Sequence, residues 1–157
     1  MKNYNAKATF FCIGKNIETH PDILEKLLKE GHAVGNHSYS HSPFFDFYRK
    51  NQVITEIRQT DALIESVLGK KTTLFRPPYG VTNPSIRRAV AVTKHKTIGW
   101  NIRSLDGVVK NEEFLLNRII KRIKPGGIVL LHDTSIQTVN VLEQLLSFLK
   151  TNNYTVV

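Results

Sequence analysis

The sequence predicts an α/β fold built from parallel β/α units. Short runs rich in β-branched and aromatic residues alternate along the whole chain with segments whose apolar residues recur at helical spacing, and the connections are short. The chain has 157 residues, 41% of them hydrophobic, which fits one domain with a core. A closed eight-stranded barrel usually takes about 250 residues. We therefore expect an open sheet, or a barrel that is reduced or lacks its beginning.

The expected strands and helices follow one another in order. Residues 8–13 form an apolar run that ends at Gly14, and residues 21–30 carry apolar side chains at helical spacing before Gly31, which predicts a strand and then a helix. Pro84 suits the first turn of a later helix, where its missing N–H costs nothing. By the same criteria we expect further strands at 33–35, 73–75, 97–102, 128–131 and 154–157, and further helices at 53–68, from 83 onward, at 114–123 and at 139–149.

Composition and charge weigh against two kinds of partner. Lys and Arg total 22 against 13 Asp and Glu, a formal charge of +9, but the basic residues are scattered over helical segments without a basic run that interleaves with aromatics. We therefore expect no nucleic-acid partner. No stretch approaches the roughly eighteen apolar residues of a membrane span, so we expect no transmembrane segment. The first residues have no signal-peptide core, so the chain as written is expected to be soluble and unexported, and its localisation is otherwise left open.

Polar residues follow four consecutive expected strands, at the ends where reactive groups gather in parallel β/α proteins. These residues are, in chain order, the pair His37 and His41, then Arg76, Asp106 and His132. Each taken singly could have a purely structural role, as a surface ion pair, a turn or a helix cap. Such roles are harder to defend for all four clusters at one rim, so we interpret them as a functional site.

Two histidines four residues apart could bind one metal ion. If His41 begins a helix, the spacing places the rings of His37 and His41 on one face about one turn apart, where two neutral nitrogens can reach one divalent ion. Zinc suits such ligands, with cobalt or nickel as alternatives. The same spacing can also arise by chance or from capping and packing, so the pair alone leaves both interpretations open.

Five segments form an ordered set of motifs over nearly the whole chain. They are 8–14 (ATFFCIG), 31–38 (GHAVGNHS), 37–41 (HSYSH), 75–80 (FRPPYG) and 130–133 (LLHD). This set resembles the NodB-homology polysaccharide deacetylases, carbohydrate esterase family 4, which remove N- or O-acetyl groups from glycans such as chitin, peptidoglycan and xylan. The resemblance implies a single NodB-like domain over residues 1–157, folded as a distorted and incomplete parallel β/α barrel.

The resemblance also implies roles for the residues that match the motifs. His37 and His41 would bind a divalent metal that polarises the acetyl carbonyl and activates water. The backbone N–H of Tyr79 would help to hold the tetrahedral oxyanion. His132 would be the general acid that protonates the leaving group, because an imidazole exchanges a proton near neutral pH.

Five more residues complete the implied site. Arg76 would orient the catalytic carboxylate, and Asp106 would belong to the same catalytic set. Leu130 would line the small pocket for the acetyl methyl group, and Pro77 and Trp100 would contact the substrate as well. The implied substrate is an acetylated polysaccharide.

One motif of the family is not found in the sequence. The family's T-F-D-D-G supplies the general base and a third metal ligand, and the chain contains no adjacent pair of aspartates. The fourth motif also departs from the pattern, since Arg103 stands where the family commonly has Asp and Gly107 where it has Trp, although Asp106 is kept. The resemblance therefore implies an N-terminally truncated domain that lacks its first strand, holds zinc poorly and hydrolyses little. Exposed strand edges at 8–13 and 154–157 would then favour a homodimer.

Two functional hypotheses follow from these observations. The first is a metal-dependent hydrolase that removes acetyl groups from a polysaccharide of the chitin, peptidoglycan or xylan type. The second is a catalytically silent carbohydrate-binding remnant of the same fold. A nucleic-acid-binding domain would instead show steeply salt-dependent binding, and the scattered basic residues do not favour it.

Overall fold

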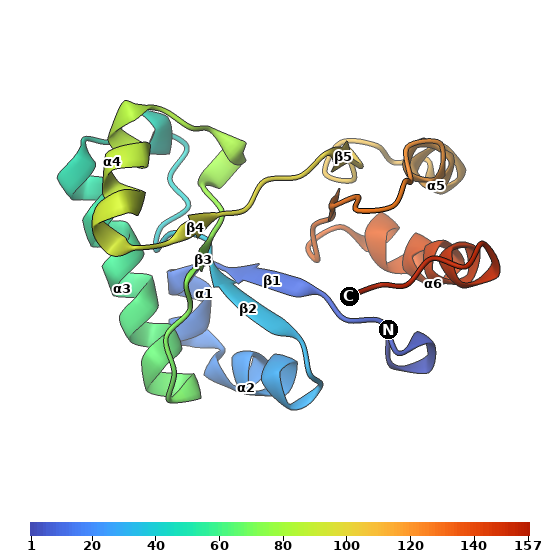
Figure 1. Ribbon diagram of the computed structural model, residues 1–157, viewed down its shortest axis with the longest axis horizontal. Coiled ribbons are helices and arrows are strands. Elements are labelled where there is room, and N and C mark those ends of the chain that lie inside the picture. Colours follow the sequence, from blue (N-terminus) through green and yellow to red (C-terminus); the bar gives the residue numbers. More distant parts are fainter. The chain divides into compact units, whose positions relative to one another are not determined.

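The computed structural model describes all residues from Met1 to Val157 and confirms an α/β fold with parallel strands (Figure 1). The strands are Thr9–Cys12 (β1), Ala33–Asn36 (β2), Leu74–Phe75 (β3), Lys96–Thr97 (β4), Ile102–Arg103 (β5) and Val129–Leu130 (β6). The α-helices are Gly14–Thr19 (α1), Pro21–Lys29 (α2), Lys50–Leu68 (α3), Pro84–Thr93 (α4), Glu112–Ile120 (α5) and Ile136–Thr151 (α6). Short 3₁₀ segments are Lys2–Tyr4 (η1), Phe45–Phe47 (η2) and Pro78–Gly80 (η3). None of the helices is long and apolar enough to cross a membrane.

The chain divides into two compact units. The first unit is Ala8–Ile98, and the second unit combines Met1–Lys7 with Gly99–Val157. The first unit contains a four-stranded parallel sheet in the order β1-β2-β3-β4, and the second contains a two-stranded parallel sheet of β5 and β6. Neither sheet closes into a barrel.

Buried side chains of α3 join the helices of the first unit to its sheet. Val53 and Ile57 of α3 are completely buried and pack in one cluster with Phe75 of β3 and Ile86 of α4. Further along α3, Ile64 packs in a second cluster with buried residues of α1 and α2. Since β1, β2 and β3 are parallel neighbours, this packing brings their carboxyl ends to the same edge of the sheet.

The second unit has its own core between its sheet and two helices. Ile102 of β5 packs with Leu115 and Ile119 of α5 and with Val141 and Leu145 of α6, and all five are buried. An asparagine cap begins α5, because the side chain of its N-cap residue accepts a hydrogen bond from the backbone N–H of Phe114 at 2.7 Å. This core fixes the strand ends that are followed by Ser104 and His132.

Two sequence predictions about elements are wrong, and one short helix was not predicted. The single strand expected at 97–102 is divided between the two sheets, because the N–H of Ile98 donates to Phe75 in the first unit whereas the N–H of Ile102 donates to Ile128 in the second. The strand expected at 154–157 is not formed, and the exposed edge expected there is therefore not a strand edge. The short helix α1 was not expected from the periodicity, because six residues are too few to show it.

Candidate active site

The histidine pair lies in the loop that follows β2. Residues 37–41 are irregular, and Ser38 and His41 adopt left-handed backbone conformations with φ of 65° and 48°. The condition that His41 begins a helix is therefore not met. The loop nevertheless brings the rings of His37 and His41 together, with centroids 4.8 Å apart at an angle of 65° between the ring planes.

A backbone carbonyl determines which nitrogen of His37 can bind a metal. Nδ1 of His37 lies 2.6 Å from the carbonyl oxygen of Arg76, and because a carbonyl only accepts, Nδ1 carries the proton and Nε2 is the ligand nitrogen. The neighbouring backbone is fixed by the sheet, since the N–H of His37 donates to Cys12 at 3.0 Å and the N–H of Arg76 donates to Asn36 at 3.0 Å. The ring is thus oriented from two adjacent strands.

Polar side chains stabilise the turn between the two histidines. The buried hydroxyl of Ser38 accepts a hydrogen bond from the N–H of His41 at 3.1 Å, and the side-chain oxygen of Asn36 accepts from the N–H of Ser38 at 2.9 Å. The amide of Asn36 in turn donates to the carbonyl of Ile57 and to Asp61, both at 2.8 Å. These bonds compensate the cost of the left-handed residues.

Arg76 and Tyr79 lie close to the histidine loop. The guanidinium of Arg76 sits 4.1 Å above the ring centroid of Phe11, its Nε donates to the carbonyl of Ile98 at 3.1 Å, and burial lowers its pKa. Tyr79 has a left-handed backbone with φ of 58°, and its ring lies 4.9 Å from that of His41. The Tyr79 side chain is exposed, whereas Pro77 is buried. The roles of these residues toward a substrate stay predictions.

His132 and Asp106 form a hydrogen-bonded pair in the second unit. Nδ1 of His132 lies 2.8 Å from Oδ1 of Asp106, and the backbone N–H of His132 donates to Oδ2 at 2.6 Å. The hydroxyls of Ser104 and Thr138 also donate to this carboxylate, at 2.9 and 2.6 Å. The carboxylate of Asp106 is completely buried, while 51% of the His132 side chain is exposed. The imidazole of His132 is therefore accessible to solvent, whereas the carboxylate that holds it is not.

The pKa values of the pair move in opposite directions. Burial by itself would raise the pKa of Asp106, but the hydrogen bonds from His132, Thr138 and Ser104 outweigh it and hold this pKa well below its usual value. The hydrogen bond to Asp106 raises the pKa of His132, and partial burial opposes that rise. The hydrogen bond between the two groups therefore favours the anionic form of Asp106 and the protonated form of His132. Such an imidazolium can act as a general acid.

The remaining predicted residues lie in the second unit. Leu130 is almost completely buried, and its carbonyl oxygen lies 2.6 Å from the Ser104 hydroxyl, whose single proton is shared between this carbonyl and the carboxylate of Asp106. Trp100 is half-buried. The structure brings Asp106, His132 and Leu130 together through Ser104, and it separately brings His37, His41, Arg76 and Tyr79 together in the first unit.

The supporting hydroxyls of Ser104 and Thr138 were missed by the sequence analysis. Thr138 lies in the first turns of α6 and reaches Asp106 across 32 positions of sequence. No local pattern signals such a contact, because a threonine near a helix start usually serves the helix itself. Ser104 stands two residues before Asp106, a spacing typical of local side-chain turns, and that signal could have been used.

The residues present fit a divalent metal only as two nitrogen ligands. No group of three or more His, Cys, Asp or Glu side chains in the structure is arranged to hold a metal ion. A metal-binding histidine usually donates a hydrogen bond from the ring nitrogen that does not bind the metal. In His37 this is the bond from Nδ1–H to the carbonyl of Arg76, which orients the ring. The two imidazole nitrogens of His37 and His41 therefore fit zinc, which binds neutral imidazoles. Other ligands would have to fill its remaining coordination positions.

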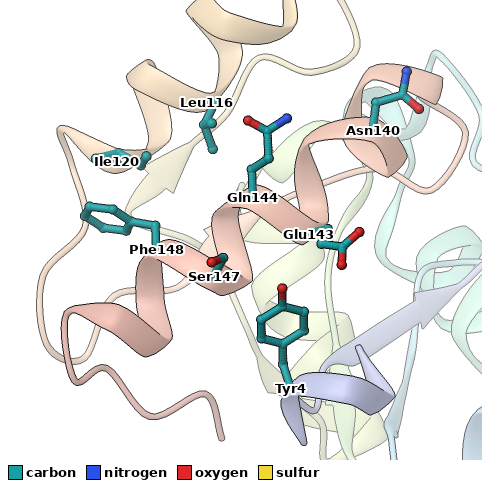
Figure 2. Close-up of a pocket in the computed structure, with 8 residues that line it drawn as sticks. All are labelled: Tyr4, Leu116, Ile120, Asn140, Glu143, Gln144, Ser147 and Phe148. Atoms are coloured by element: carbon teal, nitrogen blue, oxygen red, sulfur yellow. The ribbon is translucent and has the colours of Figure 1, made fainter.

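A surface recess of about 550 Å³ lies in the second unit, and neither Asp106 nor His132 lines it (Figure 2). Its walls come from α5, α6 and η1, and the lining residues are Tyr4, Leu116, Ile120, Asn140, Glu143, Gln144, Ser147 and Phe148. It contains none of the predicted site residues and no histidine. The chemistry of its walls therefore gives it no part in the candidate active site.

Comparisons with known proteins show the family. Residues 1–98 match the profile of the family described as Polysaccharide deacetylase. A Peptidoglycan-N-acetylglucosamine deacetylase of Bacillus cereus is 33% identical over 164 aligned positions, which cover 98% of this chain and 60% of that protein. The chain belongs to the polysaccharide deacetylase family, whose members are hydrolases and generally metal-dependent.

Solved structures show the same similarity over both units. The peptidoglycan deacetylase PdaC of Bacillus subtilis matches with a TM-score of 0.92 at 30% identity, over 99% of this chain and 75% of that one. A pseudoenzyme of carbohydrate esterase family 4 from Bacillus anthracis matches with a TM-score of 0.91 at 28% identity, over 99% of this chain and 54% of that one. The chain spans about three fifths of the length of the Bacillus cereus relative.

Proposed function

We propose that residues 1–157 form part or all of one deacetylase domain that removes acetyl groups from peptidoglycan with the help of a divalent metal. The observation that carries the proposal is the histidine pair, whose rings are 4.8 Å apart and whose His37 donates Nδ1–H to the carbonyl of Arg76. Peptidoglycan is favoured over chitin or xylan because the relatives are named as peptidoglycan deacetylases. The similarity to PdaC extends through both units, which supports a single domain.

Zinc is the proposed metal, with cobalt or nickel as alternatives, and His37 and His41 are its proposed protein ligands. A divalent ion bound there would polarise the acetyl carbonyl and lower the pKa of a water molecule. Arg76 contributes through its carbonyl, which keeps the His37 ring in the tautomer that offers Nε2. No residue of the chain is assigned as general base, because the sequence has no adjacent aspartates.

His132 is the proposed general acid. Its Nδ1–H is held by Asp106, so the proton given to the leaving amine is the one on Nε2. The hydrogen bond to Asp106 raises the pKa of His132 and so favours the protonated imidazole that a general acid requires. Tyr79 is proposed to donate its backbone N–H to the oxyanion, and Leu130, Pro77 and Trp100 to contact the substrate.

Metal binding and acetate release together test the proposal. We expect one cobalt or zinc ion to bind the chain in a calorimetric titration, and His37→Ala or His41→Ala to abolish this binding. His20→Ala is the matched control, because His20 is exposed at the start of α2 in the same unit and should leave binding unchanged. Acetate release from acetylated peptidoglycan should be slow, because no general base is assigned, but it should be chelator-sensitive, and His132→Ala should stop it. Metal uptake that survives both histidine substitutions contradicts the proposal.

A second candidate is a catalytically silent glycan-binding protein of the same fold. The absence of a third metal-ligating side chain near His37 and His41 favours it, as does the similarity to a family pseudoenzyme. This candidate predicts that peptidoglycan fragments bind without acetate release and that His132→Ala leaves their affinity unchanged. Chelator-sensitive acetate release by the unsubstituted chain excludes it.

A further inference from the structure

Glu56 of α3 holds the backbone between the two histidines. Its Oε2 accepts hydrogen bonds from the N–H of Tyr39 at 3.0 Å and from the N–H of Ser40 at 2.8 Å. Its Oε1 accepts from the hydroxyl of Ser40 at 2.8 Å. Tyr39 and Ser40 are two of the three residues that separate His37 from His41, so one carboxylate binds the centre of the histidine loop.

We propose that Glu56 is a positioning residue that sets the relative placement of the His37 and His41 rings and thereby the affinity of the pair for a divalent metal. This inference rests on the proposed function, in which the two rings are metal ligands. Glu56 would act through the loop backbone and would contact neither the metal nor the substrate.

The strength of these bonds supports the proposal. A carboxylate that accepts from backbone N–H groups makes charge-assisted hydrogen bonds, which are shorter and about twice as strong as neutral ones. Two consecutive N–H groups, those of Tyr39 and Ser40, converge on a single oxygen, which restricts the backbone torsions between them. His41 follows directly in a left-handed conformation, and such a residue persists only where its surroundings impose it.

Other contacts confine the effect of losing the Glu56 carboxylate to the part of the histidine loop near His41. On the opposite side of the loop, the N–H groups of Gly14 and Lys15 donate to the carbonyls of Ser38 and Tyr39 at 2.9 and 3.0 Å. The helix α3 is itself anchored by completely buried apolar residues, including Ile57. Loss of the Glu56 carboxylate therefore leaves the helix and the first half of the loop in place and removes both bonds that hold Ser40, next to His41, whose own N–H still donates to Ser38.

Variants of Glu56 test the proposal in the complete chain. Glu56→Ala removes all three bonds, and Glu56→Gln keeps the size of the side chain while it removes the charge and one acceptor oxygen. Glu65→Gln is the matched control on the same helix, because Glu65 is about half exposed and its carboxylate lies 3.8 Å from Lys71, far in sequence from the histidine loop. The first measurement is the cobalt affinity by calorimetry. The second is the nuclear Overhauser contact between the rings of His37 and His41 in the metal-free chain.

We expect Glu56→Ala to weaken cobalt binding by about 10- to 100-fold, the range for residues that orient metal ligands, and to abolish the ring contact. Glu56→Gln should have a smaller effect in the same direction, and Glu65→Gln none. If Glu56→Ala does not fold, Glu56→Gln decides the question by the same two measurements. An unchanged ring contact in the folded variant overturns the inference, whatever the cobalt affinity. If the unsubstituted chain binds no cobalt, the proposed metal site fails, and the ring contact alone still decides the role of Glu56.

Discussion

Replacement of Asp106 with asparagine should lower the pKa of His132 and destabilise the protein. Asp106 is completely buried and accepts four hydrogen bonds, two on each oxygen, from His132, Ser104 and Thr138. The amide has one acceptor oxygen only, so one pair of donors faces an NH₂ group that cannot accept. The variant also lacks the negative charge that is hydrogen-bonded to the imidazole, so the largest cause of the raised His132 pKa disappears.

The size of the destabilisation follows from the donors that lose a partner. An unsatisfied buried donor costs about 1–3 kcal/mol, and two donors are affected. One of the four is a serine hydroxyl and another a threonine hydroxyl, and either can rotate to accept from the amide, which recovers part of the loss. We therefore expect a net loss of about 3 kcal/mol in the free energy of unfolding. In a chain of this length, a loss of that size lowers the melting temperature by about 6–12 °C.

Two measurements test this prediction. Thermal unfolding gives the change in stability, and the chemical shift of the His132 ring as a function of pH gives its pKa. Asp133→Asn is the control, because Asp133 is exposed and acts on His132 by charge alone, so its stability effect should be negligible and its pKa effect smaller. An Asp106→Asn variant in which His132 titrates as it does in the unsubstituted protein would refute the reasoning.

The same pair predicts how stability depends on pH. Because the folded-state pKa of Asp106 is lowered, its contribution is present above the ordinary carboxyl pKa of about 4 and is lost as the pH falls through the lowered value. Because the folded-state pKa of His132 is raised, its contribution is complete below about pH 6.5 and is lost as the pH rises through the raised value. Unfolding midpoints should therefore be highest between these limits, and Asp106→Asn should flatten the profile on both sides.

Three further predictions concern the first unit. Gly35→Ala should lower the free energy of unfolding by about 1–3 kcal/mol, because a Cβ atom there would lie 2.6 Å from the ring of Phe11. An unchanged melting temperature would show that the ring can move away freely. Ser38→Ala should lower the free energy of unfolding by about 1 kcal/mol, because the N–H of His41 loses its acceptor. It should also weaken cobalt binding in a titration, and an equal affinity would exclude a role for this bond in metal binding. The protein should dimerise through the edge strand β1, and light scattering at high concentration that gives a monomer mass would contradict this.

The order of strands and helices could be predicted because periodicity is a local property of the chain. The limits of such prediction are clear in the segment around Gly99 and Trp100. Six consecutive residues there have strand-like character, but the backbone bonds of Ile98 and Ile102 go to different sheets. Periodicity reports which residues favour extended backbone, and it carries no information about the partner strand. The same limit explains the missing strand at 154–157, whose residues have β propensity without a ladder partner.

The histidine pair shows a similar mixture. Its position after a parallel strand predicted that it lies at the same rim as Arg76, and the structure places the two rings together and His37 against the carbonyl of Arg76. A helical turn starting at His41, the route considered from the spacing, is not formed, because two left-handed residues produce the same proximity in a loop. Spacing alone does not distinguish these routes, since a loop can bring residues four apart as close as a helix does.

The residues that orient the chemical groups are the ones that sequence patterns conceal. His132 stands in a motif, but the carboxylate that raises its pKa lies 26 positions earlier, and Glu56 lies 16 positions after the serine that it holds. A supporting acid needs only the right position in the folded chain, so its own neighbours carry no signature. In the sequence, Glu56 looks like an ordinary polar residue of an amphipathic helix, as does Glu65 nine positions later on α3. The two differ in what lies above them: one faces Lys71 at the surface, and the other faces two backbone N–H groups of the histidine loop. The substitutions Glu56→Gln and Glu65→Gln remove the same charge from α3, but only the first removes a carboxylate that holds the histidine loop. A difference between the two variants therefore reports the orientation of the loop and not the charge of the helix.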